Sequence, residues 1–160
     1  MLNVTLICVG KMREKHYTAA FDEYEKRLGA FCRFSLVELP EQRLPERPAQ
    51  SLIDAALEKE AAAILEHVPK GAALIAMCVE GKDMSSEALA QRFLDWQNGG
   101  VSRLCFVVGG SFGLHPTVKQ AAQLKLSMSA MTFPHHLARV MLMEQIYRAC
   151  MINAGTQYHK

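Results

Sequence analysis

The sequence predicts an α/β fold in which a parallel sheet is covered by helices on both faces. Segments typical of strands and helices alternate along the 160 residues. The strand-like segments are apolar on both sides, as buried parallel strands are. Half of the residues are apolar, which suffices for one core at this length. We therefore expect a single domain over residues 1–160, without internal repeats or linkers.

The first part of the chain predicts two strands and two helices. A β-rich run at residues 2–10 ends at a glycine, and RFSLVEL at residues 33–39 forms the second strand. Between them, residues 16–31 carry aromatic and apolar side chains at helical spacing. Three prolines mark an extended loop at residues 40–48. Apolar residues at near-helical intervals predict the second helix over residues 49–68.

The middle of the chain continues the alternation. AALIAMCV at residues 72–79 is a continuously apolar strand. Ser85 or Ser86 can cap the helix predicted over residues 87–97, which stops at an Asn-Gly-Gly sequence. RLCFVV at residues 103–108 is the next apolar strand.

The final segments predict a short helix, a last strand and a long helix. Pro116 can open the helix at residues 116–123, and LKLSMS at residues 124–129 forms the strand. The helix at about residues 135–153 is apolar nearly all round, whereas a surface helix usually keeps a polar face. A second copy of the chain would cover this extra face, so we expect a homodimer. Burial within the domain is the alternative.

Composition points to a globular protein with reduced thiols. The chain has no secretory leader and no apolar run long enough to span a bilayer, so we expect a cytoplasmic, non-membrane protein. The five cysteines are widely spaced and most lie in apolar runs, which indicates core thiols. The net charge of +2 is small, but residues 111–160 carry +4. That basic end suits an anionic partner or a solvated face.

Three strand exits carry small residues that leave the backbone accessible. They are EGK at residues 80–82, GGSFGL at 109–114 and AMTFPHH at 130–136. Ligands of open parallel sheets bind at the carboxyl ends of strands, and bare backbone groups there can hydrogen-bond a nucleoside. No dinucleotide-binding or P-loop glycine motif is present. The three exits together predict a pocket of another kind.

Two other interpretations of these loops are weaker. GGSFG matches the G-x-S-x-G of serine hydrolases, and Ser111, Glu144 and His159 follow in the required order. However, no helix is predicted directly after the serine, and Glu144 lies inside a helix. The pair His135 and His136 is a poor metal site, because adjacent helical residues point about 100° apart. We expect no metal.

Several stretches resemble the RlmH family. They are CVEGKDMSSEALA, FVVGGSFGL, LSMSAMTFPHHLARVMLMEQIYRA and the terminal QYHK, and the likeness runs nearly end to end. Members of that family methylate a pseudouridine of large-subunit (23S) ribosomal RNA with S-adenosylmethionine. The resemblance implies a SPOUT-type fold with a C-terminal trefoil knot and a homodimer. Periodicity predicts no knot, and knots are rare in general.

The resemblance also implies a cofactor site at the three exits. Met77 stands where the family often has leucine, a change that conserves volume. The implied cofactor-binding residues are Met77, Gly109, Gly110, Ser129, Ala130, Met131, Thr132, Phe133 and Pro134.

Methyl transfer to N3 of a pseudouridine requires alignment and removal of a proton. Histidine is the usual base near neutral pH, so His159 is the expected catalytic residue together with Arg139. We expect His135, Arg148 and Tyr158 to contact substrate. The absence of an RNA-binding signature indicates that the substrate is the ribosome rather than free RNA. A methyltransferase for another RNA such as tRNA and a non-catalytic ribosome-binding dimer remain open alternatives.

Overall fold

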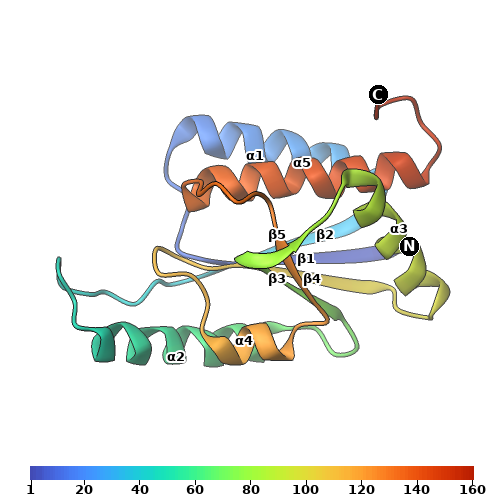
Figure 1. The fold of residues 1–160 in the computed structure, drawn as a ribbon. Helices are drawn as coiled ribbons and strands as arrows, with labels where there is room; N and C mark the ends of the chain where they lie inside the picture. Colours follow the sequence, from blue (N-terminus) through green and yellow to red (C-terminus); the bar gives the residue numbers. More distant parts are fainter.

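The computed structural model describes residues Met1 to Lys160 as five parallel strands between two layers of helices (Figure 1). The strands are β1 (Leu2–Val9), β2 (Cys32–Leu39), β3 (Ala73–Asp83), β4 (Arg103–Val108) and β5 (Leu124–Ser127). The helices are α1 (Lys15–Leu28), α2 (Gln50–His67), α3 (Ser86–Asn98), α4 (Pro116–Ala121) and α5 (His135–Asn153). The predicted number, type and order of elements are confirmed.

The sheet has the strand order β2-β1-β4-β3-β5, and all of its pairings are parallel. The central strands β1 and β4 are almost fully buried, and side chains on both of their faces are inaccessible. Their uninterrupted apolar runs are therefore explained by helices on both sides.

Two apolar cores lie on opposite faces of the sheet. Helices α1, α3 and α5 cover one face, where Phe93 and Ile146 pack toward Phe106 of β4. Helices α2 and α4 cover the other face, where Ile64 and Val118 belong to a smaller core (Figure 1). This is the predicted three-layer arrangement.

Strand β3 is longer than predicted because it pairs with β5 twice. Leu126 is paired with both Met77 and Lys82, so the four residues between them bulge away from the ladder. At Gly81 an added Cβ atom would lie 2.7 Å from the carbonyl carbon of Leu126. The close approach of two backbones at this point requires glycine. The trefoil knot implied by the resemblance stays a prediction.

Helix α5 is enclosed to a large extent within its own chain. None of its residues is exposed, because α1 and α3 flank it while the sheet lies beneath. Much of its apolar circumference is thus explained by burial within the domain, the alternative considered above. The homodimer stays a prediction.

Buried Glu60 on α2 fixes the start of the loop between β2 and α2. Glu60 is 7% exposed, and its carboxylate accepts a hydrogen bond of 2.9 Å from the backbone N–H of Gln42. Burial is the main cause that raises the pKa of Glu60 above its usual value of 4.5, while the Gln42 bond opposes the shift. The folded protein therefore binds the proton more firmly than the unfolded chain. The free energy of unfolding therefore falls as the pH rises through the raised pKa of Glu60 and the buried carboxyl becomes charged.

Replacing Glu60 with glutamine is expected to raise the melting temperature at pH 7 by a few degrees. The amide oxygen can still accept the Gln42 N–H, but no charge is buried. The advantage should disappear below about pH 4.5, where the wild-type carboxyl is protonated. Thermal unfolding between pH 4 and 7 measures this. Glu58→Gln changes an exposed carboxylate of the same helix and is the control; a Glu60→Gln protein less stable than wild type at pH 7 would contradict the prediction.

Candidate functional site

A cavity of about 320 Å³ lies at the carboxyl ends of β3, β4 and β5. All three predicted strand exits contribute to its wall, in agreement with the rule for open parallel sheets. Predicted site residues that line it are Met77, Gly109, Gly110, Ser129, Met131, Thr132, Phe133 and His135. Ala130 and Pro134 belong to the same loop but do not line the cavity.

The loop from β4 to α4 is compact because of its glycines. Gly110 and Gly113 form an antiparallel bridge, and the N–H of Gly113 donates to the carbonyl of Gly110 at 3.1 Å. An added Cβ atom at Gly109 would lie 2.5 Å from the carbonyl oxygen of Gly113. No side chain fits at Gly109 unless this loop moves, so the cavity wall here is bare backbone.

Serine hydroxyl groups shape the loop from β5 to α5. The Ser127 hydroxyl donates to the carbonyl of Ser129 at 3.1 Å, and the Ser129 hydroxyl accepts the N–H of Met131 at 3.0 Å. The carbonyl of Pro134 then accepts the N–H of Ala138 at 2.9 Å, which starts α5. These bonds give the loop a fixed shape beside the cavity.

Large apolar side chains stand unusually exposed at the mouth of the cavity. Met131 is 74% exposed and Phe112 is 47% exposed, and both line the cavity. Exposed apolar side chains beside bare backbone groups suit a ligand with a flat apolar face and polar edges. An adenine ring has both features.

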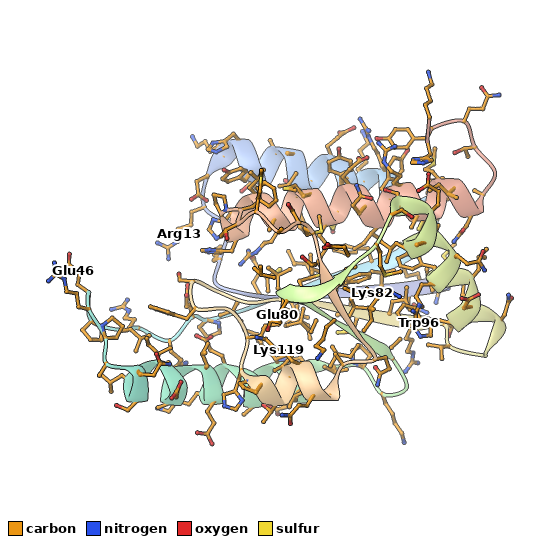
Figure 2. The ribbon with its side chains drawn as sticks, in the orientation of Figure 1. Arg13, Glu46, Glu80, Lys82, Trp96 and Lys119 are labelled. Atoms are coloured by element: carbon orange, nitrogen blue, oxygen red, sulfur yellow. The ribbon has the colours of Figure 1, made fainter.

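An ion pair crosses the same cavity. Glu80, just after the buried part of β3, pairs with Lys119 of α4, and both line the wall (Figure 2). Lys119 is the main cause that holds the pKa of Glu80 below its usual value. This pair ties β3 and α4 together in the wall of the cavity.

His135 lines the cavity, and its surroundings lower its pKa. Burial lowers the pKa of His135 below its usual value of 6.5, and the neighbouring His136 and Arg139 lower it further. Glu41 and Glu14 oppose these effects. A neutral imidazole can accept a proton or a hydrogen bond from a ligand.

Arg139 lies outside the cavity lining, buried where α5 meets β1. It is 1% exposed, and its Nη2 donates to the carbonyls of Val9 at 2.8 Å and Gly10 at 2.7 Å. Its Nη1 lies 3.4 Å from a carboxylate oxygen of Glu38. These contacts favour a role in holding the exit of β1 against α5, and the expected catalytic role has no contact that supports it.

Arg148 and Tyr158, predicted to contact substrate, form a second cluster with His159, the predicted catalytic histidine. Arg148 donates to Glu144 at 2.7 Å, and the Tyr158 hydroxyl donates to the same carboxylate at 3.1 Å. The ring nitrogens of His159 lie 3.1 Å from Arg148 and 2.6 Å from Glu87. In one chain this cluster is separate from the lining of the cavity.

A second hollow of about 500 Å³ borders this cluster. Glu144 lines it, together with residues from the start of α3 and the middle of α5. Residues 126–128 line both this hollow and the cavity described above. The two concave regions therefore adjoin at the end of β5.

The serine-hydrolase interpretation is wrong, because its three residues are not brought together. Glu144 is engaged by Arg148 and Tyr158, and His159 by Arg148 and Glu87. The backbone N–H of Ser111 donates instead to Glu41 at 2.8 Å. A turn, and no helix, follows Ser111 until α4 begins at Pro116.

Sequence reasoning missed several residues of the cavity wall. Phe112 lies within the predicted glycine exit, Lys119 lies after it, and Cys78 and Glu80 lie within the bulge of β3. Lys119 lies on the helix directly after that exit. This closeness in sequence is the one signal that could have placed Lys119 in the cavity wall. The structure brings together no group of three or more His, Cys, Asp or Glu side chains that could hold a metal ion. No helix is long and apolar enough to cross a membrane.

A parallel sheet with a backbone-lined cavity at its carboxyl edge is the arrangement in which α/β proteins bind ligands. Residues 2–159 match the family described as "Predicted SPOUT methyltransferase". The chain belongs to this family of methyltransferases.

Relatives of this chain have more specific names. The chain is 46% identical over 159 residues to "Ribosomal RNA large subunit methyltransferase H" of Bifidobacterium animalis subsp. lactis, covering 99% of this chain and 100% of the relative. The protein of the same name from Clostridium novyi shows the same identity and coverage.

Solved structures show the same fold at low identity. A probable methylase family protein from Haemophilus influenzae has a TM-score of 0.55 at 11% identity, covering 99% of this chain and 71% of its own. A putative methylase family protein from Neisseria gonorrhoeae has a TM-score of 0.53 at 15% identity, with coverages of 91% and 82%. These two likenesses concern the fold alone.

Proposed function

We propose that this chain is an S-adenosylmethionine-dependent methyltransferase that acts on N3 of a pseudouridine in 23S ribosomal RNA. The observation that carries the proposal is the cavity walled by bare backbone and small residues from three strand exits. It occurs in a chain 46% identical, over nearly its full length, to proteins named as large-subunit ribosomal RNA methyltransferases.

The residues of the cavity fit S-adenosylmethionine. The volume of about 320 Å³ is within the usual range for small-molecule sites. Gly109 and Gly110 present backbone groups for the polar edges of the nucleoside, and Met131 and Phe112 can cover its apolar face. The bound cofactor would supply an activated methyl group, so the protein must mainly align it with the base and accept a proton.

Two histidines can handle the proton of the base. His159 is the first candidate, although its nitrogens contact Arg148 and Glu87 within a single chain. His135 is the second, since it lines the cavity and has a lowered pKa. In the homodimer that we propose, the tail of one chain would bring His159 and Tyr158 to the cavity of the other.

Replacing His159 with alanine is expected to lower turnover by about 100-fold and leave cofactor affinity unchanged. Single-turnover methylation of ribosomes measures the first quantity, and calorimetry with S-adenosylmethionine measures the second. Gln157→Ala alters an exposed residue of the same tail and should behave as wild type. Undiminished turnover of His159→Ala would remove this histidine from the mechanism and direct attention to His135.

The substrate is best identified in cells. Mass mapping of 23S ribosomal RNA from a deletion strain should reveal one pseudouridine that lacks its methyl group. A missing methyl group in tRNA instead would establish the alternative substrate. Absence of S-adenosylmethionine binding in calorimetry would leave the non-catalytic ribosome-binding dimer as the better interpretation.

We further propose that the protein acts in the cytoplasm on assembled ribosomes. Residues 111–160 carry a net charge of +4, which attracts an anionic partner, but the whole chain carries only +2. Contacts to a shaped particle would supply the missing affinity. Free 23S stem-loops should therefore be poor substrates compared with ribosomes.

A further inference from the structure

The proline-containing loop between β2 and α2 places a carboxylate behind the wall of the cavity. Glu41, the second residue of this loop, is half-buried and does not line the cavity. Its Oε1 accepts a hydrogen bond of 2.8 Å from the backbone N–H of Ser111. The acceptor is a carboxylate, and hydrogen bonds to charged groups are about twice as strong as neutral ones.

Gly110 is shaped to receive this carboxylate. A Cβ atom at Gly110 would lie 2.5 Å from Oε1 and 2.8 Å from Cδ of Glu41. Gly110 has no positive φ, so it is the position of the Glu41 carboxylate, and not the backbone conformation, that leaves no space for a Cβ atom here. The missing side chain would point toward Glu41 and Val9, whose Cγ1 lies 3.3 Å away. Glu41 therefore occupies the place that a side chain at Gly110 would take.

Glu41 is itself held on both sides. Before it, the carbonyl of Leu39 accepts the N–H of Gly10 at 2.6 Å. After it, the N–H of Gln42 donates to buried Glu60 at 2.9 Å. The carboxylate also lies close to Gly10, where an added Cβ atom would be 3.4 Å from Oε2. The support is thus fixed to β1, β2 and α2 before any ligand arrives.

The supported loop has few other hydrogen bonds of its own. Within residues 109–113, the bond from Gly113 to Gly110 closes the turn, and Phe112 extends outward half exposed. The bond from Ser111 to Glu41 is the one that joins this turn to the rest of the sheet edge. Without it, the position of the turn would depend on its covalent ends and on packing.

We propose that Glu41 is a positioning residue that fixes the glycine turn for cofactor binding. This inference rests on the proposed use of S-adenosylmethionine. Glu41 does not line the cavity and acts through Ser111 and Gly110. Its loss therefore weakens cofactor binding without changing the chemical step.

The first test compares Glu41→Ala with Glu41→Gln by calorimetry with S-adenosylmethionine. We expect the alanine variant to bind about 10-fold more weakly, because a preordered turn becomes mobile. The glutamine variant should bind within about 3-fold of wild type, since its amide oxygen can still accept the Ser111 N–H. Glu46→Ala is the matched control: it removes an exposed carboxylate at the outer end of the same loop (Figure 2).

Turnover separates positioning from general loss of structure. At saturating S-adenosylmethionine, Glu41→Ala should retain turnover within about 2-fold of wild type, while its KM for the cofactor rises about 10-fold. Its melting temperature should stay close to that of wild type. The inference would be overturned if both Glu41→Ala and Glu41→Gln lost turnover to the same large extent at saturating S-adenosylmethionine. It would also be overturned if the KM for the cofactor stayed unchanged in both variants.

A double-mutant cycle tests the contact between Glu41 and Gly110 directly. Gly110→Ala alone should weaken cofactor binding strongly, because the new methyl group displaces the carboxylate. In the Glu41→Ala background the same change should cost much less, so the two effects are not additive. Additive effects would contradict the contact.

Failure of this inference can be distinguished from failure of the proposed function. If wild type binds S-adenosylmethionine and Glu41→Ala binds it equally well, only the role of Glu41 is lost. If wild type does not bind it, the cofactor assignment fails. In either case, hydrogen exchange reports whether the Ser111 amide loses protection in Glu41→Ala, and unchanged protection would refute the support itself.

Discussion

Gly109→Ala is expected to lower the affinity for S-adenosylmethionine by at least about 100-fold. The added methyl group would stand 2.5 Å from the carbonyl oxygen and 2.6 Å from the carbonyl carbon of Gly113. Both atoms are backbone, so the turn itself must shift by more than the usual tolerance of a packed site, and the wall of the cavity shifts with it. Calorimetry with the folded variant measures the effect.

Gly29→Ala is the control for this experiment. Gly29 follows α1 with a φ of −56°, and its added Cβ atom would meet only the carbonyl oxygen of Lys26 at 3.3 Å. This variant should bind the cofactor as wild type does. If Gly109→Ala also keeps its affinity, then the turn at residues 109–113 is not part of the cofactor site.

Arg139→Met is expected to destabilise the protein by about 3 kcal/mol or more. The variant leaves the carbonyls of Val9 and Gly10 without their donor and the carboxylate of Glu38 without its cation. Buried polar groups that lose their partners bear the full cost of desolvation. Denaturant unfolding at pH 7 measures the loss as a lower transition midpoint.

Arg13→Met is the matched control, since Arg13 is exposed on the loop after β1 (Figure 2). It should change the free energy of unfolding by less than about 0.5 kcal/mol. Unchanged stability of Arg139→Met together with lost turnover would instead support the catalytic role expected from the sequence. The two measurements therefore decide between the roles.

The architecture could be predicted from the sequence because its signals are local. Apolar runs and helical spacing identify each element from its own residues. The order β2-β1-β4-β3-β5 could not be predicted in this way, because it depends on pairings between distant segments. The extension of β3 to Asp83 was missed for the same reason, since its partner Ser127 is far along the chain.

The residues of the candidate site likewise divide into those with a local signal in the sequence and those that depend on contacts between distant segments. Gly109 and Gly110 lie in a glycine-rich strand exit that is visible in the sequence, and the resemblance implied these two residues and Ser129 as cofactor-binding. The supporting role of Glu41 was not, since it depends on a loop that returns to the sheet edge. The burial of Arg139 also was not, because a charged residue on a helix reads as exposed until its neighbours are known.

The central position of β1 has a consequence for the way the chain acquires its structure. Its partner β2 follows closely, but its other neighbour β4 pairs Arg103 with Asn3, about one hundred positions away. During synthesis one edge of β1, which is apolar, stays unpaired until β4 has emerged from the ribosome. Pairings between strands far apart in the sequence slow folding and leave unpaired strand edges that are prone to aggregation. We expect nascent chains that end before β4 to depend on chaperones, whereas chains that extend beyond it should not.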